Sequence, residues 1–447
     1  MGRTAAEHAE GLFDRARGVL ASGVSASMRL HPYLGRPFYA SRGDGAYLYD
    51  LEGRRFIDFN VSNGATMLGH NHPGVRAAIE EGLGAGIITA AETPYHERLA
   101  ETLTDIIPAA ERVRFASTGT EVTMVALRLA RHATGRTTVL KFGGHFHGLS
   151  EPFLYKQETD EPDAAVVPSS GGVPAAGAAD VVIVPWNDAA AFEAALAQHG
   201  RDLAAVIAEP VFYNAGCIPP APGFLELLRE GTRRVGALLI FDEVLSGFRM
   251  ALGGAQEWSG VTPDLCTLAK AVANGMPLSV VAGRADLMEQ LAPTGPVAHS
   301  GTYSGHLLSV LAALATLDEL RRPGVYDRIT AESEAFYRDL QAVFDRHGVP
   351  ARVQGLGTRF GLYFGRREPV TTLADAATND HDMSRRFVLG CLARGVYFHA
   401  YARAGAPGHA GYSLAHTPAD FAETLDVIDA VSAELRGADG LRAAGSL

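Results

Sequence analysis

Between residues 61 and 325 the chain alternates short, almost continuously apolar runs with stretches of helical periodicity. Runs of four or five residues that are apolar at nearly every position are typical of strands buried on both faces of a mostly parallel sheet. We therefore expect an α/β fold in which helices flank a large, mostly parallel sheet. The predicted strands are residues 113–116, 139–142, 181–185, 205–208, 237–241, 265–269 and 279–282.

The chain has a different pattern before residue 61 and in one stretch of its middle. Residues 7–20 place apolar side chains on one helical face, which predicts an amphipathic helix. Residues 46–50 and 55–59 are strand-like runs joined by a short turn. Residues 157–180 are rich in Pro, Gly and Ala and have no periodicity, so a surface loop or lid is expected there.

The Arg-Pro-Gly sequence at 322–324 marks a plausible domain boundary, because helices mixed with strands such as Arg359–Phe364 follow it. This pattern predicts a smaller α+β lobe at the C-terminal end. The expected parts are an N-terminal segment that packs with the small lobe (1–60), a large domain (61–325) and a C-terminal small domain (326–447).

Composition narrows the possible partners. The 447 residues carry a formal net charge of -11, whereas nucleic acids and anionic membranes require a basic protein surface. No stretch approaches the roughly 20 apolar residues of a membrane span. The three cysteines are odd in number and far apart, which argues against a disulfide framework. We expect a cytoplasmic protein that binds neither nucleic acid nor membrane.

The residues directly after the predicted strands carry the candidate chemistry, because ligands of open parallel sheets bind beyond the carboxyl ends of the strands. Residues Ser117, Thr118, Gly119 and Thr120 follow the strand at 113–116 and precede a predicted helix. Small residues at a helix N-terminus can hold a phosphate through backbone N–H groups. The alternative is an ordinary capping box, in which Thr118 pairs with Glu121.

Two charged residues follow other predicted strands. Asp242 comes after the strand at 237–241, where its carboxylate can pair with a protonated ring nitrogen, cap a helix or bind a metal. Lys270 comes after the strand at 265–269, where desolvation would make it a nucleophile for carbonyl groups; the alternative is a lysine that reaches the surface. A phosphate site, a ring-nitrogen carboxylate and a carbonyl-reactive lysine together fit pyridoxal 5′-phosphate (PLP).

The segments that carry these residues resemble the class III aminotransferases of PLP fold type I. Within that family, the chain most resembles glutamate-1-semialdehyde 2,1-aminomutase and the β-amino-acid aminotransferases. The matching segments are GAYLYDLEGRRFIDF, LGHNHP, STGTEVTMVALRLAR, GGHFHG, AVIAEP, ALLIFDEVLSGFR, GVTPDLCTLAKAVANGMP and HSGTYSG.

The resemblance implies roles for three catalytic residues. Lys270 would bind PLP as a Schiff base and then move the proton, and Asp242 would keep the pyridine nitrogen protonated. Glu209 would lie near the cofactor hydroxyl and the substrate. The implied reaction is ping-pong transfer of an amino group from a small amino acid or amine donor to a keto acid or aldehyde acceptor. An aminomutase would instead return the nitrogen to a neighbouring carbon of the same molecule.

The resemblance also implies which residues surround the cofactor. Gly119 and Thr120 would hold the phosphate, and Ser117 and Thr118 would also contact the cofactor. Phe146 and Val244 would cover the two ring faces, and His147 would brace the pocket. Thr302 would reach the phosphate bound to the neighbouring subunit, which implies a homodimer with shared active sites.

The substrate side departs from the family pattern. Arg29 is a candidate for binding a substrate carboxylate, and Asn63 replaces a tryptophan expected in the aminomutase. The stretch 403–416 lacks both the acidic residue of the aminomutase and the usual carboxylate-binding arginine, unless Arg403 or Arg29 substitutes. These departures favour a specialised aminotransferase over the aminomutase. A PLP racemase or decarboxylase and a non-catalytic PLP-binding protein are the remaining alternatives.

Two other motifs superficially resemble binding sites of a different kind. The pairs His70/His72 and His145/His147 have a spacing that a metal site can use, but no cysteine or carboxylate cluster accompanies them, so no metal is expected. The glycines of residues 355–361 have the wrong spacing and place in the chain for a dinucleotide-binding loop.

Overall fold

The computed structural model describes residues 5–159, 164–398, 402–403 and 405–444. Its largest sheet has seven strands in the order β10-β7-β11-β12-β13-β14-β6. Each strand corresponds to one of the seven predicted runs, so the predicted α/β class is confirmed. The strands are β6 (Arg112–Ala116), β7 (Thr138–Phe142), β10 (Val181–Val184), β11 (Leu203–Ala208), β12 (Leu238–Glu243), β13 (Leu265–Leu268) and β14 (Ser279–Gly283).

Only β14 in this sheet runs against the other strands. It is antiparallel to both β13 and β6, and all other neighbouring pairs are parallel. The carboxyl ends of β6, β7, β11, β12 and β13 therefore meet at one edge of the sheet. The loops that leave these five strands can build one shared site.

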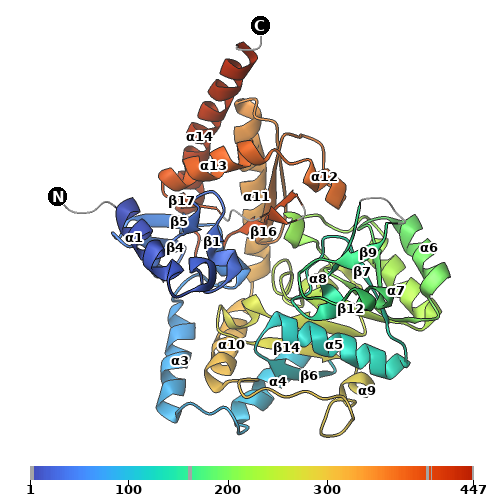
Figure 1. Cartoon of the computed structure of the whole chain (residues 1–447). Coiled ribbons are helices and arrows are strands. Elements are labelled where there is room, and N and C mark those ends of the chain that lie inside the picture. The colour runs from blue at the N-terminus through green and yellow to red at the C-terminus, as the bar shows by residue number, and fades with distance from the viewer. Residues whose placement is uncertain (1–4, 160–163, 399–401, 404, 445–447) are drawn as a thin grey trace.

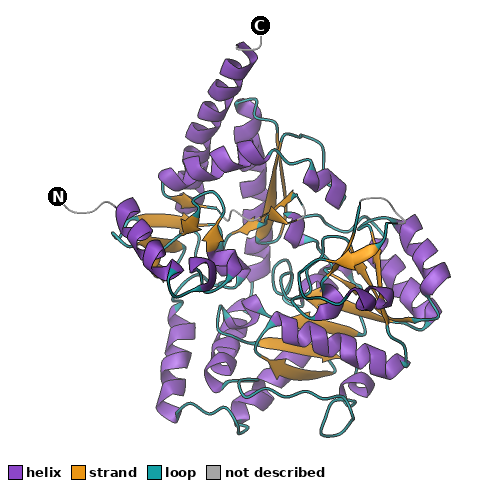
Figure 2. Cartoon of the chain, in the orientation of Figure 1, coloured by secondary structure: helices purple, strands orange, loops and turns teal. Residues whose placement is uncertain are grey.

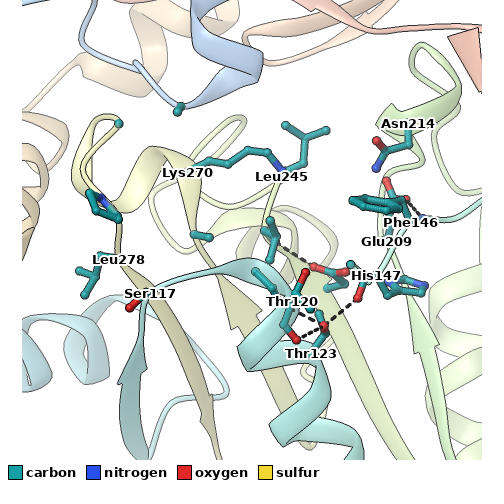
Figure 3. A pocket seen from close by; sticks show the side chains of 18 of the residues that line it. Ser117, Thr120, Thr123, Phe146, His147, Glu209, Asn214, Leu245, Lys270 and Leu278 are labelled. Atoms are coloured by element: carbon teal, nitrogen blue, oxygen red, sulfur yellow. Dashed lines mark hydrogen bonds and ion pairs between the residues drawn. The ribbon is translucent and has the colours of Figure 1, made fainter. Parts of the chain in front are cut away.

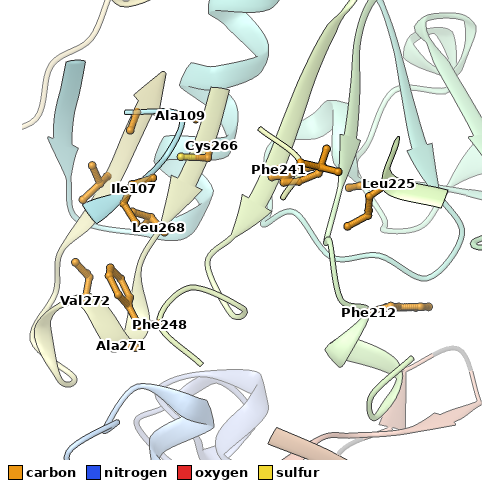
Figure 4. Close-up of a cluster of buried hydrophobic side chains, with 14 of the residues drawn as sticks. Ile107, Ala109, Phe212, Leu225, Phe241, Phe248, Cys266, Leu268, Ala271 and Val272 are labelled. Atoms are coloured by element: carbon orange, nitrogen blue, oxygen red, sulfur yellow. The ribbon is translucent and has the colours of Figure 1, made fainter. Parts of the chain in front are cut away.

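Helices cover both faces of the sheet (Figures 1 and 2). Successive strand residues point to opposite faces: Leu239 and Phe241 belong to one hydrophobic cluster, whereas Ile240 belongs to the other. Figure 4 shows part of the larger cluster, where Phe241, Cys266 and Leu268 line the same side of the sheet. The helices of the chain are α1 (Ala5–Arg17), α2 (Val61–Gly64), α3 (Pro73–Ala85), α4 (Pro94–Ile106), α5 (Gly119–Thr134), α6 (Ala189–His199), α7 (Phe224–Val235), α8 (Gly254–Ser259), α9 (Ala285–Met288), α10 (Leu307–Leu320), α11 (Val325–Arg346), α12 (Leu373–Ala377), α13 (His381–Ala393) and α14 (Pro418–Ala444).

The N-terminal and C-terminal segments lie side by side, beside the large sheet (Figure 1). They share a four-stranded sheet in the order β17-β5-β4-β3, in which β17 (Val396–Tyr397) pairs in parallel with β5 (Arg55–Asp58). The ring of Phe59 stacks on those of Phe336 and Phe398, with centroids 5.5 and 5.1 Å apart. The exact division at residues 60 and 325 stays a prediction. The other strands here are β1 (Leu30–His31), β2 (Arg36–Pro37), β3 (Ala40–Asp44), β4 (Tyr47–Asp50), β15 (Ala351–Leu356), β16 (Arg359–Phe364), β18 (Ala402–Arg403), β19 (Ala406–Pro407) and β20 (Ala410–Gly411).

The stretch 157–180 has more regular structure than the predicted loop. Strand β8 (Tyr155–Gln157) pairs with β9 (Val166–Pro168) as an antiparallel hairpin, and a 3₁₀ segment covers Ala175–Asp180. Buried Lys141 anchors the start of the hairpin, because its Nζ donates to the carbonyl oxygens of Phe153 and Tyr155 at 2.9 and 3.1 Å. The expectation of an irregular loop was therefore wrong over the hairpin.

In the described part of the chain, the helices are all too short or too polar to cross a membrane.

Candidate active site

A pocket of about 280 Å³ opens at the carboxyl edge of the large sheet. Most of the residues predicted at the strand ends line it: Ser117, Gly119, Thr120, Phe146, His147, Glu209, Asp242, Val244 and Lys270. Figure 3 shows Lys270 extending across the pocket from one wall, with Phe146 and Glu209 on the opposite wall and Thr120 below. The structure thus brings together residues that are up to 153 positions apart in the chain.

Lys270 is the first residue of a 3₁₀ turn, Lys270–Ala273, that is separated from β13 by one residue. Its φ of 46° lies in the left-handed region, an uncommon conformation for a residue with a side chain. Asn274 holds the end of the turn, because its side chain accepts from the N–H of Leu68 and donates to the carbonyl of Gly69. Desolvation lowers the pKa of the Lys270 amine from 10.5 to about 8.

Asp242 lies near the end of β12 and is held by three hydrogen bonds. Its Oδ1 accepts from the Val244 N–H at 3.1 Å and from the Thr267 hydroxyl at 3.0 Å. Its Oδ2 lies 2.7 Å from Nδ1 of the buried His147. Because a carboxylate only accepts hydrogen bonds, Nδ1 carries the proton in this pair. These bonds fix the direction in which the carboxylate faces the pocket.

Glu209 directly follows β11 and is almost fully buried. Its Oε1 accepts from the Phe146 N–H at 2.8 Å, while its own N–H donates to Nδ1 of His145 at 3.0 Å. Desolvation raises the pKa of Glu209 to about 7, and the nearby charge of Asp242 acts in the same direction. The carboxyl group can therefore hold or release a proton near neutral pH.

The N-terminus of α5 has the predicted capping box and also free N–H groups that could bind a phosphate. The capping box is present, because the Glu121 carboxylate accepts from the N–H groups of Ser117 and Thr118 while Thr118 caps the helix. The next residues, Gly119 and Thr120, line the pocket with the first N–H groups of the helix, which have no intrahelical acceptors. Capping therefore does not exclude anion binding at the same helix end.

Several predicted residues lie away from this pocket. Thr118 is occupied with capping, and Thr302 is exposed in a turn. Arg29 and Asn63 line a second cavity of about 590 Å³ formed largely by the N-terminal segment. Arg403 belongs to β18, and its side chain lies outside the described part of the structure.

Three of the four histidines in these pairs have partners other than metals. His70 Nε2 lies 2.7 Å from Asp58, and His145 and His147 bond to Glu209 and Asp242 as described above. Among the described residues, groups of three or more His, Cys, Asp or Glu side chains suited to a metal ion are absent.

Some pocket residues were not predicted from the sequence. Asn214, Leu245 and Met276 come from loops after strand ends, and Thr123 comes from the second turn of α5. Thr123 had a detectable signal, since it lies one helical turn after Gly119 on the same face. Its hydroxyl donates to the His147 carbonyl at 2.7 Å and so ties α5 to the segment that carries Phe146.

Comparisons with known proteins agree with this geometry. The sequence pattern of the family "Aminotransferase class-III" matches residues 32–402. A glutamate-1-semialdehyde 2,1-aminomutase from Thermomicrobium roseum is 44% identical over 382 residues, which are 85% of this chain and 88% of that protein.

Solved structures give the same result. An omega-transaminase from Sphaerobacter thermophilus superposes with a TM-score of 0.87 at 31% identity, covering 96% of this chain and 98% of the other. A β-phenylalanine aminotransferase from Variovorax paradoxus superposes with a TM-score of 0.84 at 31% identity, covering 97% and 94%. The chain belongs to the class III aminotransferases, a family of PLP-dependent enzymes.

Proposed function

We propose that the 280 Å³ pocket is the site where this PLP-dependent aminotransferase moves an amino group from an amino acid or amine to a keto acid or aldehyde. The observation that carries the proposal is the convergence of Lys270, Asp242 and Glu209 from three strand ends on one pocket. The lowered pKa of Lys270, about 8, leaves part of its amine uncharged near neutral pH.

The pocket residues fit the cofactor. Glu209 Oε2 is buried near Asn214 without a hydrogen bond of ordinary geometry to the described residues, so a donor group of a ligand would satisfy it. At the other end of the pocket, Gly119 has no side chain, and a Cβ there would lie only 3.1 Å from Val244. The bare backbone lets a phosphate approach the N–H groups of the helix N-terminus. Thr120 lies at the same helix end.

Each residue has a separate task in this proposal. Bound PLP supplies an electron sink that stabilises negative charge on the substrate carbon next to the nitrogen. Asp242 would face the protonated pyridine nitrogen, and its three hydrogen bonds hold the carboxylate in a fixed orientation. Lys270 Nζ accepts the proton from the substrate carbon next to the nitrogen and returns it to the carbon on the other side of that nitrogen. Phe146 and Val244, which line the pocket, would cover the two ring faces and exclude water from them.

The substrate is assigned to the space between this pocket and the 590 Å³ cavity. Ser62 and Asn63 line the cavity and Ala65 lines the pocket, so the two spaces are separated by a short stretch of chain. Arg29 is exposed, and its guanidinium donates to the Ser25 hydroxyl at 2.6 Å, a weak partner that a carboxylate would replace. We assign Arg29 to binding a substrate carboxylate, with Asn63 beside it; Arg403 stays a further candidate.

A homodimer is part of the proposal. Thr302 is exposed, and the neighbouring Tyr303 leaves 65% of its surface open to solvent in the single chain. A second subunit covering this turn would place Thr302 at the partner's phosphate. Location in the cytoplasm likewise stays a prediction.

Intramolecular transfer is the second candidate, and it is favoured by the 44% identity to the aminomutase. Incubation of the PLP-loaded protein with one amino donor at a time distinguishes the two reactions. We expect a released keto product and retention of nitrogen on the protein until a carbonyl acceptor is added. Formation of an isomer of the substrate with no dependence on an acceptor would instead establish an aminomutase.

A further inference from the structure

Two arginines, Arg249 and Arg359, are completely buried in the wall behind the pocket. A Cβ placed on Gly64 would lie 3.2 Å from Arg249 Nη2 and 3.5 Å from Arg359 Cζ, so both guanidinium groups approach the same point. Buried arginines are normally paired with a carboxylate. Within the described residues, neither of these arginines has a carboxylate within ion-pair distance.

Their hydrogen bonds do not neutralise the two charges. Arg249 donates to the carbonyls of Gly64 and Leu245 and to the Met67 sulfur. Arg359 donates to Nδ1 of His409, while its Nε and Nη1 have no partner among the described residues. Desolvation lowers the pKa of Arg249 to about 10 and that of Arg359 to about 9, so both keep their charge at neutral pH.

Only a thin layer separates the pair from the lysine. Leu245 and Ala65 line the pocket, and the Leu245 carbonyl is 3.0 Å from Arg249 Nε. Figure 3 shows the Leu245 side chain beside the end of Lys270. Water screens the charges of the two arginines poorly behind these apolar side chains. Their repulsion of a protonated Lys270 amine is therefore stronger than it would be in water.

We propose that Arg249 and Arg359 are positioning residues whose buried positive charge increases the fraction of the Lys270 amine that is deprotonated near neutral pH. The two arginines lower the pKa of Lys270 in addition to desolvation, which is the larger cause. Asp242 and Glu209 act on Lys270 in the opposite direction. The groups that face the arginine pair itself are Asp58, Tyr213, Tyr326, Tyr337 and His409.

The inference deepens the proposed function, because it explains how the cofactor lysine becomes reactive. Its test is independent of that function, because it uses the full chain after removal of PLP. The sequence contains only three lysines, Lys141, Lys156 and Lys270. Trace acetylation between about pH 6 and pH 11, followed by peptide mass spectrometry, measures the pKa of each one, with exposed Lys156 as internal reference.

The test compares native protein with Arg359→Met, Arg359→Gln and Arg359→Lys. We expect the pKa of Lys270 to be about 8 in the native protein. It should rise by about 1 in Arg359→Met and Arg359→Gln, since the loss of one poorly screened charge near an ionisable group changes its ionisation constant by up to about tenfold. Arg359→Lys should restore the native value. A purely structural arginine would move the melting temperature without this dependence on charge.

Arg229→Met is the matched control, because Arg229 is a buried arginine with a carboxylate partner, Asp264 at 2.8 Å, and is not among the main charges that act on Lys270. It should leave the pKa of Lys270 unchanged. A native Lys270 with an ordinary pKa of about 10.4 would overturn the proposal without any variant. So would an unchanged pKa in folded Arg359→Gln. If Lys270 has the expected pKa but the loaded protein transfers no amino group, the proposed function fails and this inference stands.

Discussion

Asp242 and His147 form a buried pair in which the carboxylate Oδ2 lies 2.7 Å from the imidazole Nδ1. His147 is 1% exposed and Asp242 is 4% exposed, so water does not compete for this contact. The imidazole fills one acceptor site of the carboxylate, and Val244 and Thr267 fill others. These three contacts therefore hold the carboxylate rigidly, and one of its acceptor sites is left for a donor in the pocket.

Replacement of Asp242 by Asn tests the role of the negative charge on this carboxylate. The amide keeps the shape but removes the negative charge that stabilises a protonated ring nitrogen. We expect kcat to fall by at least about 100-fold, which is typical of the loss of a positioned proton-controlling group. Steady-state kinetics with the best donor measure it, and circular dichroism confirms the fold. Activity within a few-fold of native would show that Asp242 has no such role.

The raised pKa of Glu209 predicts a pH dependence of stability. In the folded chain its pKa is about 7, above the ordinary value of 4.5, so the folded state binds a proton more tightly than the unfolded state. This contribution is fully present below pH 4.5 and is lost as the pH rises through 7. The expected slope in this window is at most about 1.4 kcal/mol per pH unit.

Glu209→Gln is the variant that isolates this contribution. Urea unfolding of the cofactor-free chain at several pH values should show that native protein loses stability relative to the variant between pH 4.5 and 7. A difference that stays constant across this window would mean that the buried carboxyl has an ordinary pKa.

Gly119 tests the phosphate site by steric means. A Cβ at this position would lie 3.1 and 3.2 Å from the two methyl groups of Val244, closer than ordinary contacts. Gly119→Ala should therefore disturb the helix end and Val244 and weaken PLP binding by roughly tenfold, about 1.4 kcal/mol. Gly84→Ala is the control, because a Cβ there meets nothing within 4 Å. Equal PLP affinity in both variants would place the phosphate elsewhere.

Arg29 tests the carboxylate assignment. Arg29→Gln should raise KM about tenfold or more for donors that carry a carboxylate and leave amine donors without one unaffected, because only the former lose a charge-assisted hydrogen bond. Arg15→Gln, at an exposed position of α1, serves as the control. An equal effect on both donor classes would contradict a carboxylate-binding role.

The large sheet and its strand-end chemistry were predictable because both follow from local sequence. An apolar run such as Leu203–Ala208 is typical of a central strand of a parallel sheet, and the structure buries all six of its positions. In a parallel sheet the strand ends meet, so the order of apolar runs and charged residues is enough to place Asp242 and Lys270 together.

The remaining features depend on contacts between distant segments. Asn214 and Leu245 enter the pocket from loops, whose paths no periodicity specifies. The hairpin after Tyr155 is stabilised by Lys141, a residue from β7, which the composition of 157–180 does not reveal. The buried charge of Arg359 was also not predictable, since arginine in a strand pattern normally indicates an exposed position.

The most direct test of the central claim is the identity of the lysine that binds PLP. Loaded protein is reduced with borohydride, digested, and its PLP-bearing peptide identified by mass spectrometry. Since the chain has only three lysines, the answer is unambiguous. We predict that the label lies on Lys270 alone and that Lys270→Ala abolishes it. Labelling of Lys141 or Lys156 at comparable yield, or no label after loading with PLP, would contradict the account.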